Sequence, residues 1–181
     1  MLTELQTRKL TRLFGLYDVK GKGVIEREDY ELVAHNTAIA LSHQPGSQEY
    51  ALLHTEYMAS WDNLQQLADS DNDNQLTLTE FLNGYESLMA DKERFAGVIM
   101  GLVKTTLRLQ DTNNDGKVSA EEHRAYMNAF NVAPAEIAET FRRLDRDGDG
   151  FLTTEEMVLN TEEFFLSDNP QAPGNWLVGS Y

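Results

Sequence analysis

The chain has 181 residues, no cysteine, and 30 acidic against 15 basic residues, so its formal net charge at pH 7 is −15. This length suits one compact domain or two tightly packed lobes, and the lack of cysteine excludes disulfides, zinc–thiolate sites and a thiol nucleophile. The acidity argues against nucleic acid and anionic membranes as partners, because both are bound through Lys and Arg.

The expected location follows from the absence of two sequence signals. No apolar run is long enough to span a bilayer, and residues 1–5 lack the basic region and apolar core of a secretory signal. We therefore expect a soluble, cytoplasmic protein that is a monomer and has no obligatory protein partner.

A twelve-residue pattern recurs four times, starting at Asp18, Asp69, Asp111 and Asp145. In its most complete copy, residues 145–156, carboxylates stand at positions one, three and five, glycine at six, a hydrophobic residue at eight and glutamate at twelve. This is the spacing of an EF-hand loop, in which about six to eight oxygens converge on one calcium ion. Apolar-periodic segments flank every copy, so the repeating unit is helix–loop–helix.

Helical periodicity and end signals place the helices between these loops. Thr3 is a plausible N-cap for the first helix, and Pro134 suits the first turn of a later one. The predicted helices span residues 2–17, 27–43, 48–68, 78–91, 92–110, a segment to about Phe130, 134–144, and a segment to about Leu166.

The first loop is expected to keep the fold without binding an ion. Lys20 and Lys22 stand at its third and fifth positions, where calcium requires oxygens, and Asp29 replaces glutamate at the twelfth. Each such contact between like charges costs on the order of several kcal/mol. We expect the lysines to replace the ion by pairing with Asp18, Glu26 or Asp29; a weak site is the alternative.

The second loop, residues 69–80, has all four carboxylates. Its expected ligands are the acidic side chains and the seventh-position carbonyl, which belong to Asp69, Asp71, Asp73, Gln75 and Glu80. Thr77 completes the set. Asn74 replaces the usual glycine at the sixth position. Asparagine is the non-glycine residue best suited to a left-handed backbone, so we expect binding to be retained at a small cost in strain.

The third and fourth loops supply two further complete sets of oxygens. For the third loop the expected ligands are Asp111, Asn113, Asp115, the Lys117 carbonyl and Glu122, with Ser119 beside them. For the fourth loop they are Asp145, Asp147, Asp149, the Phe151 carbonyl and Glu156, with Thr153 acting directly or through water. We therefore expect three calcium ions, with Mg²⁺ as a competitor, and binding that is coupled to folding.

Because one helix–loop–helix unit cannot bury its own apolar face, the loops should pair. The eighth-position residues are expected to form minimal antiparallel ladders, Ile25 with Leu76 and Val118 with Leu152. The predicted fold class is all-α, with four EF-hands in two paired lobes forming one compact globule. The predicted divisions are residues 1–91, residues 92–167 and a tail, residues 168–181, that packs on the body.

The four loops, the degenerate first copy and the tail resemble the sarcoplasmic calcium-binding proteins, their bacterial relative calerythrin, and calexcitin. Beyond the loops, the most specific part of the resemblance is residues 165–177. The family resemblance implies a two-lobed cytosolic calcium buffer or transporter with three active hands. In the tail, Pro170 and Pro173 stop the last helix, and Trp176 and Leu177 offer an apolar peg for the groove between the hands.

Calcium buffering is the leading functional interpretation, and two alternatives stay open. A sensor that exposes a groove to a target usually carries a methionine-rich surface, whereas the six methionines here are scattered. A luciferin-type carrier of the same fold would need a cavity, which Tyr50, His54, Tyr57 and Trp61 could line.

The sequence gives no support to an enzyme. The four histidines, which we interpret as surface or partly buried structural residues, form no metal-ligand pair and accompany no nucleophile motif: His35, His43, His54 and His123.

Overall fold

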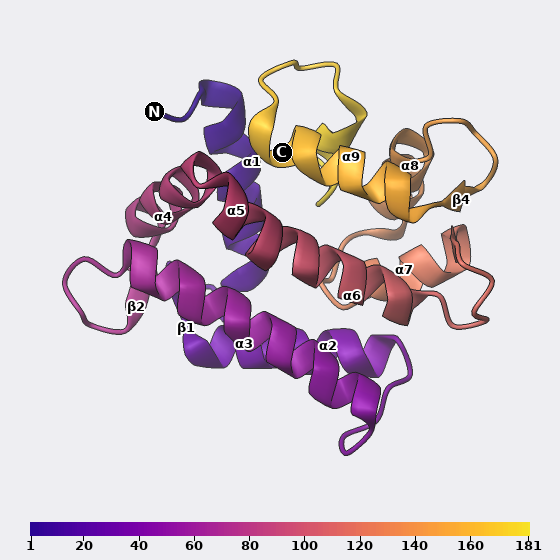
Figure 1. Ribbon diagram of the computed structural model, residues 1–181, viewed down its shortest axis with the longest axis horizontal. Coiled ribbons are helices and arrows are strands. Elements are labelled where there is room, and N and C mark those ends of the chain that lie inside the picture. Colours follow the sequence, from indigo (N-terminus) through magenta and orange to yellow (C-terminus); the bar gives the residue numbers. More distant parts are fainter.

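Helix–loop–helix units follow one another along the whole chain in the computed structural model, which describes residues 1–181. The α-helices are α1 (Glu4–Tyr17), α2 (Arg27–Ala40), α3 (Gln48–Ala68), α4 (Leu78–Ala90), α5 (Lys92–Phe95), α6 (Gly101–Gln110), α7 (Ala120–Asn128), α8 (Pro134–Leu144) and α9 (Thr154–Leu166). Figure 1 shows the two pairs of loops at opposite ends of the molecule, connected through the segment from α5 to α6. None of the helices is both long and apolar enough to cross a membrane.

The loops pair through two short antiparallel ladders, as expected. Strand β1 (Val24–Glu26) pairs with β2 (Gln75–Thr77), and β3 (Val118–Ser119) pairs with β4 (Phe151–Leu152). The register places Ile25 opposite Leu76 and Val118 opposite Leu152, and all four side chains are buried. The predicted fold class is confirmed.

The main hydrophobic core extends across both predicted pairs of hands. Its 26 buried residues come from α1 to α4, from the α5–α6 segment and from α9. On α9, the Phe165 ring stacks on Tyr85, and it also meets Phe95 edge-on, each at a centroid distance of 5.5 Å. This core is continuous across residue 91. The predicted division of the chain into two lobes at that residue stays a prediction.

The predicted helix over residues 92–110 is interrupted. A π-helical segment, η1 (Ala96–Met100), separates α5 from α6. A π turn holds an extra residue, so it rotates the faces of the helix before and after it. Phe95 and Ile99 thereby pack in the main core, whereas Leu107 packs in a second cluster beside Val118 and Leu152.

Three other helix ends differ from the prediction by two or three residues. α1 begins at Glu4 rather than at residue 2, and its N-cap is Thr3, the residue predicted for that role. α2 ends at Ala40, two residues before Ser42 takes a left-handed conformation with φ 65°. α7 ends at Asn128 rather than near Phe130.

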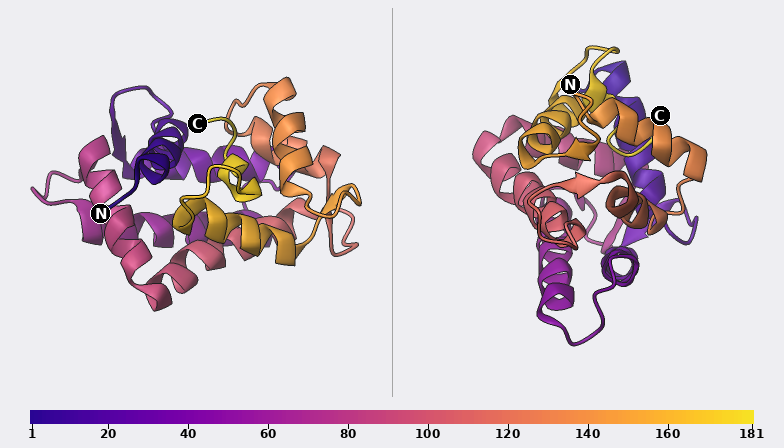
Figure 2. Two further views of the ribbon diagram at one scale, coloured as in Figure 1. Left: turned by 90° about the horizontal axis from the view of Figure 1, so that it is seen from above. Right: turned by 90° about the vertical axis from the view of Figure 1, so that its right-hand side faces the viewer.

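The tail folds back on α8 and α9 through a 3₁₀ turn, η2 (Pro173–Trp176) (Figure 2). Its deepest side chain is Asn175, which is fully buried and accepts a hydrogen bond from Lys9 Nζ at 3.0 Å. Trp176 and Leu177, predicted as the apolar peg, are only half-buried; Trp176 lies against the Arg143 guanidinium, 4.0 Å from its ring centroid.

Candidate metal centres

All four loops share one backbone framework, in which the first aspartate caps the turn. Asp18, Asp69, Asp111 and Asp145 each accept a hydrogen bond from the amide of the sixth residue, at 2.7, 3.2, 2.8 and 3.0 Å respectively. The sixth residue is left-handed in each loop, with φ 79° at Gly23, 63° at Asn74, 84° at Gly116 and 86° at Gly150. The expected conformation of Asn74 is confirmed, and it positions the loop carboxylates as the glycines do.

The twelfth-position glutamates are held by the helix that each loop leads into. Thr77, Ser119 and Thr153, at the ninth positions, are the N-caps of α4, α7 and α9, and the glutamate three residues later completes a capping box. The spacing from position nine to position twelve therefore serves the helix start and aims the carboxylate at the loop.

The other carboxylate oxygen of each glutamate accepts a hydrogen bond from the backbone amide at position two of the same loop. Glu80 Oε1 accepts from Ser70 N at 3.2 Å, and Glu122 Oε1 accepts from Thr112 N at 2.9 Å. Hydrogen bonds from Thr77 lower the pKa of Glu80 to about 2. Partial burial raises the pKa of Glu122, but hydrogen bonds from Ser119 and Thr112 outweigh it and lower the pKa overall. Both side chains are therefore anionic at neutral pH.

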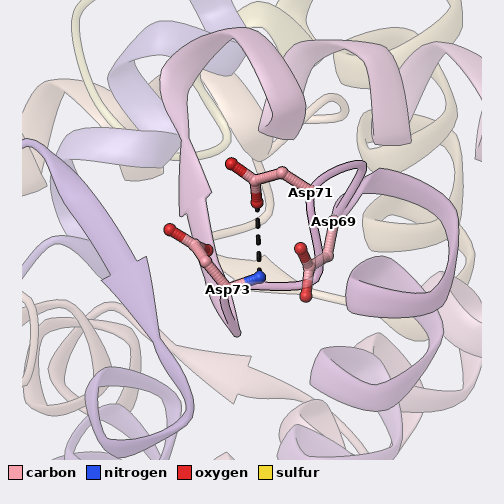
Figure 3. A group of neighbouring side chains, drawn as sticks. All are labelled: Asp69, Asp71 and Asp73. Atoms are coloured by element: carbon pink, nitrogen blue, oxygen red, sulfur yellow. Dashed lines mark hydrogen bonds between the residues drawn. The ribbon is translucent and has the colours of Figure 1, made fainter.

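In the second loop three carboxylates converge (Figure 3). One oxygen from each of Asp69, Asp71 and Asp73 lies within 4.8 Å of the others. Asp71 Oδ1 accepts from the Asp73 amide at 3.3 Å, whereas Asp69 Oδ1 is buried and has no hydrogen-bond partner. Such a set of hard anionic oxygens, one of them buried and unpaired, fits a divalent cation such as Ca²⁺.

The fourth loop repeats this arrangement. Oxygens of Asp145, Asp147 and Asp149 again lie within 4.8 Å of one another. The Lys117 ammonium, from the third loop, reaches across to Asp149 Oδ2 at 3.1 Å and lies 4.8 Å from the Phe151 ring centroid. From the sequence only the backbone carbonyl of Lys117 was expected to contribute, and this side-chain contact between two loops was missed.

At its first, third and fifth positions, the third loop combines two carboxylates with an amide. Asn113 Oδ1 accepts from the Asp115 amide at 2.9 Å, and Asn113 Nδ2 donates to Asp115 Oδ2 at 3.0 Å. The seventh-position residues Gln75, Lys117 and Phe151 each donate their amide to the fifth-position carboxylate, at 2.7, 3.0 and 2.9 Å. The structure thus brings together the first-, third- and fifth-position side chains of the second and fourth loops and connects those of the third by hydrogen bonds, and the assignment of ligands stays a prediction.

The first loop contains a cation of its own. The Lys22 ammonium pairs with Glu26 and lies 3.5 Å from Asp29 Oδ2. Asp29, at the twelfth position, is fully buried. Two of the three pairings expected for the lysines are therefore present, whereas Asp18 accepts backbone amides instead, including that of Lys22 at 2.8 Å.

Comparison with known proteins agrees with this loop geometry. A family model for the EF hand matches residues 102–125 and 137–158, which contain the third and fourth loops. Calerythrin from Saccharopolyspora erythraea is 30% identical over 166 residues, which span 91% of this chain and 94% of calerythrin. The chain belongs to the calerythrin and sarcoplasmic calcium-binding protein family. It is therefore a calcium-binding EF-hand protein, and the family expected from the sequence is confirmed.

Two further similarities show the breadth of this family. The luciferin-binding protein of Renilla reniformis is 27% identical over 177 residues, covering 95% of this chain and 92% of that protein. A solved Streptomyces coelicolor calcium-binding protein, described in terms of prokaryotic calcium-mediated regulation, superposes with a TM-score of 0.77 at 26% identity. It covers 90% of this chain and 98% of the other.

A central cavity of about 110 Å³ lies between the two pairs of hands. Of the residues expected to line such a space, Tyr57 does so, whereas Trp61 is buried elsewhere in the core and Tyr50 and His54 lie outside it. His123, interpreted from the sequence as surface or partly buried, is 1% exposed and lines the cavity. Burial lowers the pKa of His123 to about 4, so its ring is neutral at pH 7.

Proposed function

We propose that one monomer binds three calcium ions, at the second, third and fourth loops, and acts mainly as a calcium buffer. The observation that carries this proposal is the contrast between loops of the same backbone geometry. The second and fourth loops gather three aspartates within 4.8 Å, and in the third Asp111 and Asn113 both accept a hydrogen bond from the Asp115 amide. In the first loop the Lys22 ammonium pairs with the loop acids instead.

The tail favours a buffer over a sensor. A sensor opens an apolar groove when calcium binds. Here Leu177 and Val178, after the 3₁₀ turn, already pack against the main core between the hands. A groove that the chain itself covers offers no surface to a target helix, so calcium binding should close the molecule rather than expose it.

The number of ions can be tested with one substitution made at the same position of each loop. We expect isothermal titration calorimetry to count three ions in the parent protein and in Asp18→Asn. Two ions are expected in each of Asp69→Asn, Asp111→Asn and Asp145→Asn. Asp18→Asn is the matched control, because it makes the same change in a loop of the same geometry. A loss of calcium in Asp18→Asn, or no loss in the other three, would contradict the proposal.

The fluorescence of a hydrophobic dye distinguishes a calcium buffer from a calcium sensor. During a calcium titration with about millimolar Mg²⁺ present, a buffer should lose dye fluorescence as its core closes. A rise at saturation would show an exposed groove, which would favour the regulatory role described for the Streptomyces protein.

A small-ligand carrier is the second candidate. The Renilla relative is named for luciferin binding, and the central cavity of this chain is the observation that favours a related role.

A further inference from the structure

Helix α9 leads from the fourth loop to the C-terminal tail, which folds back along it (Figure 1). Glu156, Asn160 and Glu163 are four and three residues apart on this helix, so their side chains share one face. The first of them is the twelfth residue of the fourth loop, and the last lies beside the tail. This row of polar side chains therefore connects the loop with the tail.

Arg146, at position two of the fourth loop, contacts every member of this row. Its amide donates to Glu156 Oε1 at 2.9 Å, and its Nε donates to Asn160 Oδ1 at 3.0 Å. Its guanidinium forms an ion pair with Glu163 Oε2. Both partners of this ion pair are partly shielded, with side chains 26% and 30% exposed. One residue of the loop thus reaches two turns along α9.

Glu163 carries the connection into the tail. The same Oε2 accepts a hydrogen bond from the Gly174 amide at 3.0 Å. The Glu163 backbone carbonyl accepts from Lys9 Nζ, which also donates to the fully buried Asn175, both at 3.0 Å. A continuous chain of polar contacts therefore runs from the fourth loop through Glu163 to the tail and to α1.

Charge makes this chain responsive to calcium. The fourth loop has carboxylates at four expected ligand positions, and Arg146 lies within that loop. In the empty loop these carboxylates attract the guanidinium and compete with Glu163 for it. A bound calcium ion brings two positive charges and occupies the loop carboxylates. Arg146 is then free to pair with Glu163, and Glu163 with Arg146 in place is held where it accepts from Gly174.

We propose that Arg146 and Glu163 couple the fourth calcium site to the docking of the C-terminal tail. Calcium at this loop fastens the tail, and the docked tail strengthens calcium binding at this loop, because coupling between two binding events is reciprocal. This inference rests on the proposed function of the fourth loop. Both side chains are positioning residues, since neither is an expected ligand.

The effect on calcium is measured by ¹H–¹⁵N NMR of the full chain during a chelator-buffered calcium titration. The Gly116 and Gly150 amides, which donate to Asp111 and Asp145, report on the third and fourth loops separately. In Glu163→Gln the Kd of the fourth loop should rise about three- to fivefold, as expected for one partly shielded ion pair. The third loop should be unaltered. Glu162→Gln makes the same charge change at the exposed neighbouring residue and should leave both loops unaltered.

The reverse effect is measured on the tail at saturating calcium. Arg146→Met should accelerate proteolysis near the C-terminus several-fold. Arg124→Met, which removes an exposed arginine of α7 that pairs with Glu121, is the matched control and should not. Once Arg146 is replaced, adding Glu163→Gln should weaken the fourth loop no further, because the partner that transmits its effect is gone. A residue that only stabilises α9 would instead give additive effects.

Equal fourth-loop affinities in Glu163→Gln and Glu162→Gln would overturn the coupling. Additive effects in the double variant, or equal proteolysis of Arg146→Met and Arg124→Met, would overturn it as well. Circular dichroism identifies a variant that fails to fold, in which case the other single variant decides. A Gly150 amide that does not respond to calcium in the parent protein would overturn the fourth calcium site itself, so the two failures are distinguishable.

Discussion

At the scale of single residues, Lys9 makes the most unusual set of contacts. Its side chain is fully buried, and its ammonium donates to the Glu163 carbonyl, the Ser167 carbonyl and Asn175 Oδ1 at 3.0, 2.9 and 3.0 Å. Burial lowers the pKa of Lys9 to about 8, so the group is still protonated at pH 7. All three N–H donors then have a partner, which offsets the cost of burying the charge.

Replacing Lys9 should therefore be costly. In Lys9→Met three buried acceptors lose their donor, and we expect the free energy of unfolding to fall by about 3 kcal/mol. Urea unfolding of the calcium-loaded protein measures this change. Lys104→Met, at an exposed lysine, is the matched control and should change stability by less than about 0.5 kcal/mol. Equal effects of the two substitutions would contradict the role assigned to the buried contacts.

Asn74 gives a second prediction for a single residue. Its φ of 63° disfavours most side chains, and its Oδ1 accepts from Gln65 Nε2 at 2.9 Å. Asn74→Ala should destabilise the calcium-loaded protein by about 1–2 kcal/mol, because alanine strains the left-handed turn. Asn74→Gly should stay within about 0.5 kcal/mol of the parent protein, since glycine adopts this conformation without strain. If alanine and glycine have the same thermal stability, the strain argument is wrong.

At the scale of elements, the features that were predicted correctly from the sequence depend on short-range spacing. The loop pattern fixes positions six, eight and twelve, so the ladders Ile25–Leu76 and Val118–Leu152 and the conformation of Asn74 followed from local chemistry. The π segment at residues 96–100 did not, because an extra residue in one turn leaves the apolar pattern of residues 92–110 almost unchanged.

Contacts between distant segments were also beyond the sequence. Lys9 and Asn175 are separated by 166 residues, and Lys117 meets Asp149 from another loop. Nothing in their local patterns marks these side chains as partners. His123 was misjudged for a similar reason, since its burial depends on packing against other elements, such as Phe141 of α8 at a ring-centroid distance of 5.7 Å.

The tail yields a prediction at this scale, because Gly174 sits directly against α9. A Cβ at this position would lie 2.2 Å from the Asn160 carbonyl oxygen and 2.7 Å from Glu163 Cβ. Gly174→Ala should therefore displace the tail, and Trp176 should lose its place on Arg143. We expect a red shift of tryptophan fluorescence and faster proteolysis near the C-terminus.

Gly15→Ala is the matched control for the tail. This glycine lies in α1 with open space around its Cβ position, so alanine should stabilise the protein by up to about 1 kcal/mol and leave the tail docked. Unchanged fluorescence and unchanged proteolysis in Gly174→Ala would show that the tail tolerates the added methyl group and is not held by this contact.

At the scale of the whole molecule, buried tyrosines make stability depend on alkaline pH. Tyr17, Tyr30, Tyr57 and Tyr85 lie in the main core, and burial raises the pKa of each hydroxyl. The unfolded chain releases these protons near pH 10, whereas the folded chain retains them. The folded state therefore binds more protons above about pH 10, and its stability falls as pH rises.

Absorbance of tyrosinate near 295 nm tests this linkage. Burial also raises the hydroxyl pKa of Tyr126, beside this core, so we expect five of the seven tyrosines to ionise only together with loss of the far-ultraviolet circular dichroism signal. Tyr85→Phe should shift that transition to higher pH, because it removes one of the linked protons. Ionisation of all seven tyrosines before any loss of structure would refute the linkage.

Removal of calcium should loosen the whole molecule through charge repulsion. The three complete loops hold 11 carboxylates at predicted ligand positions in a chain of net charge −15. If all three proposed sites are filled at about 100 times their Kd, calcium contributes roughly 8 kcal/mol. That is comparable to the total stability of a small domain. With chelator we expect a lower melting temperature and a weaker near-ultraviolet circular dichroism signal.

Raising salt from about 10 mM to 1 M shortens the screening length from about 30 to 3 Å, so it should recover part of the lost stability in chelator. The calcium-loaded protein should respond much less, because its loop charges are already neutralised. An unchanged near-ultraviolet signal in chelator, or equal salt responses of the two forms, would show that packing alone holds the loops together.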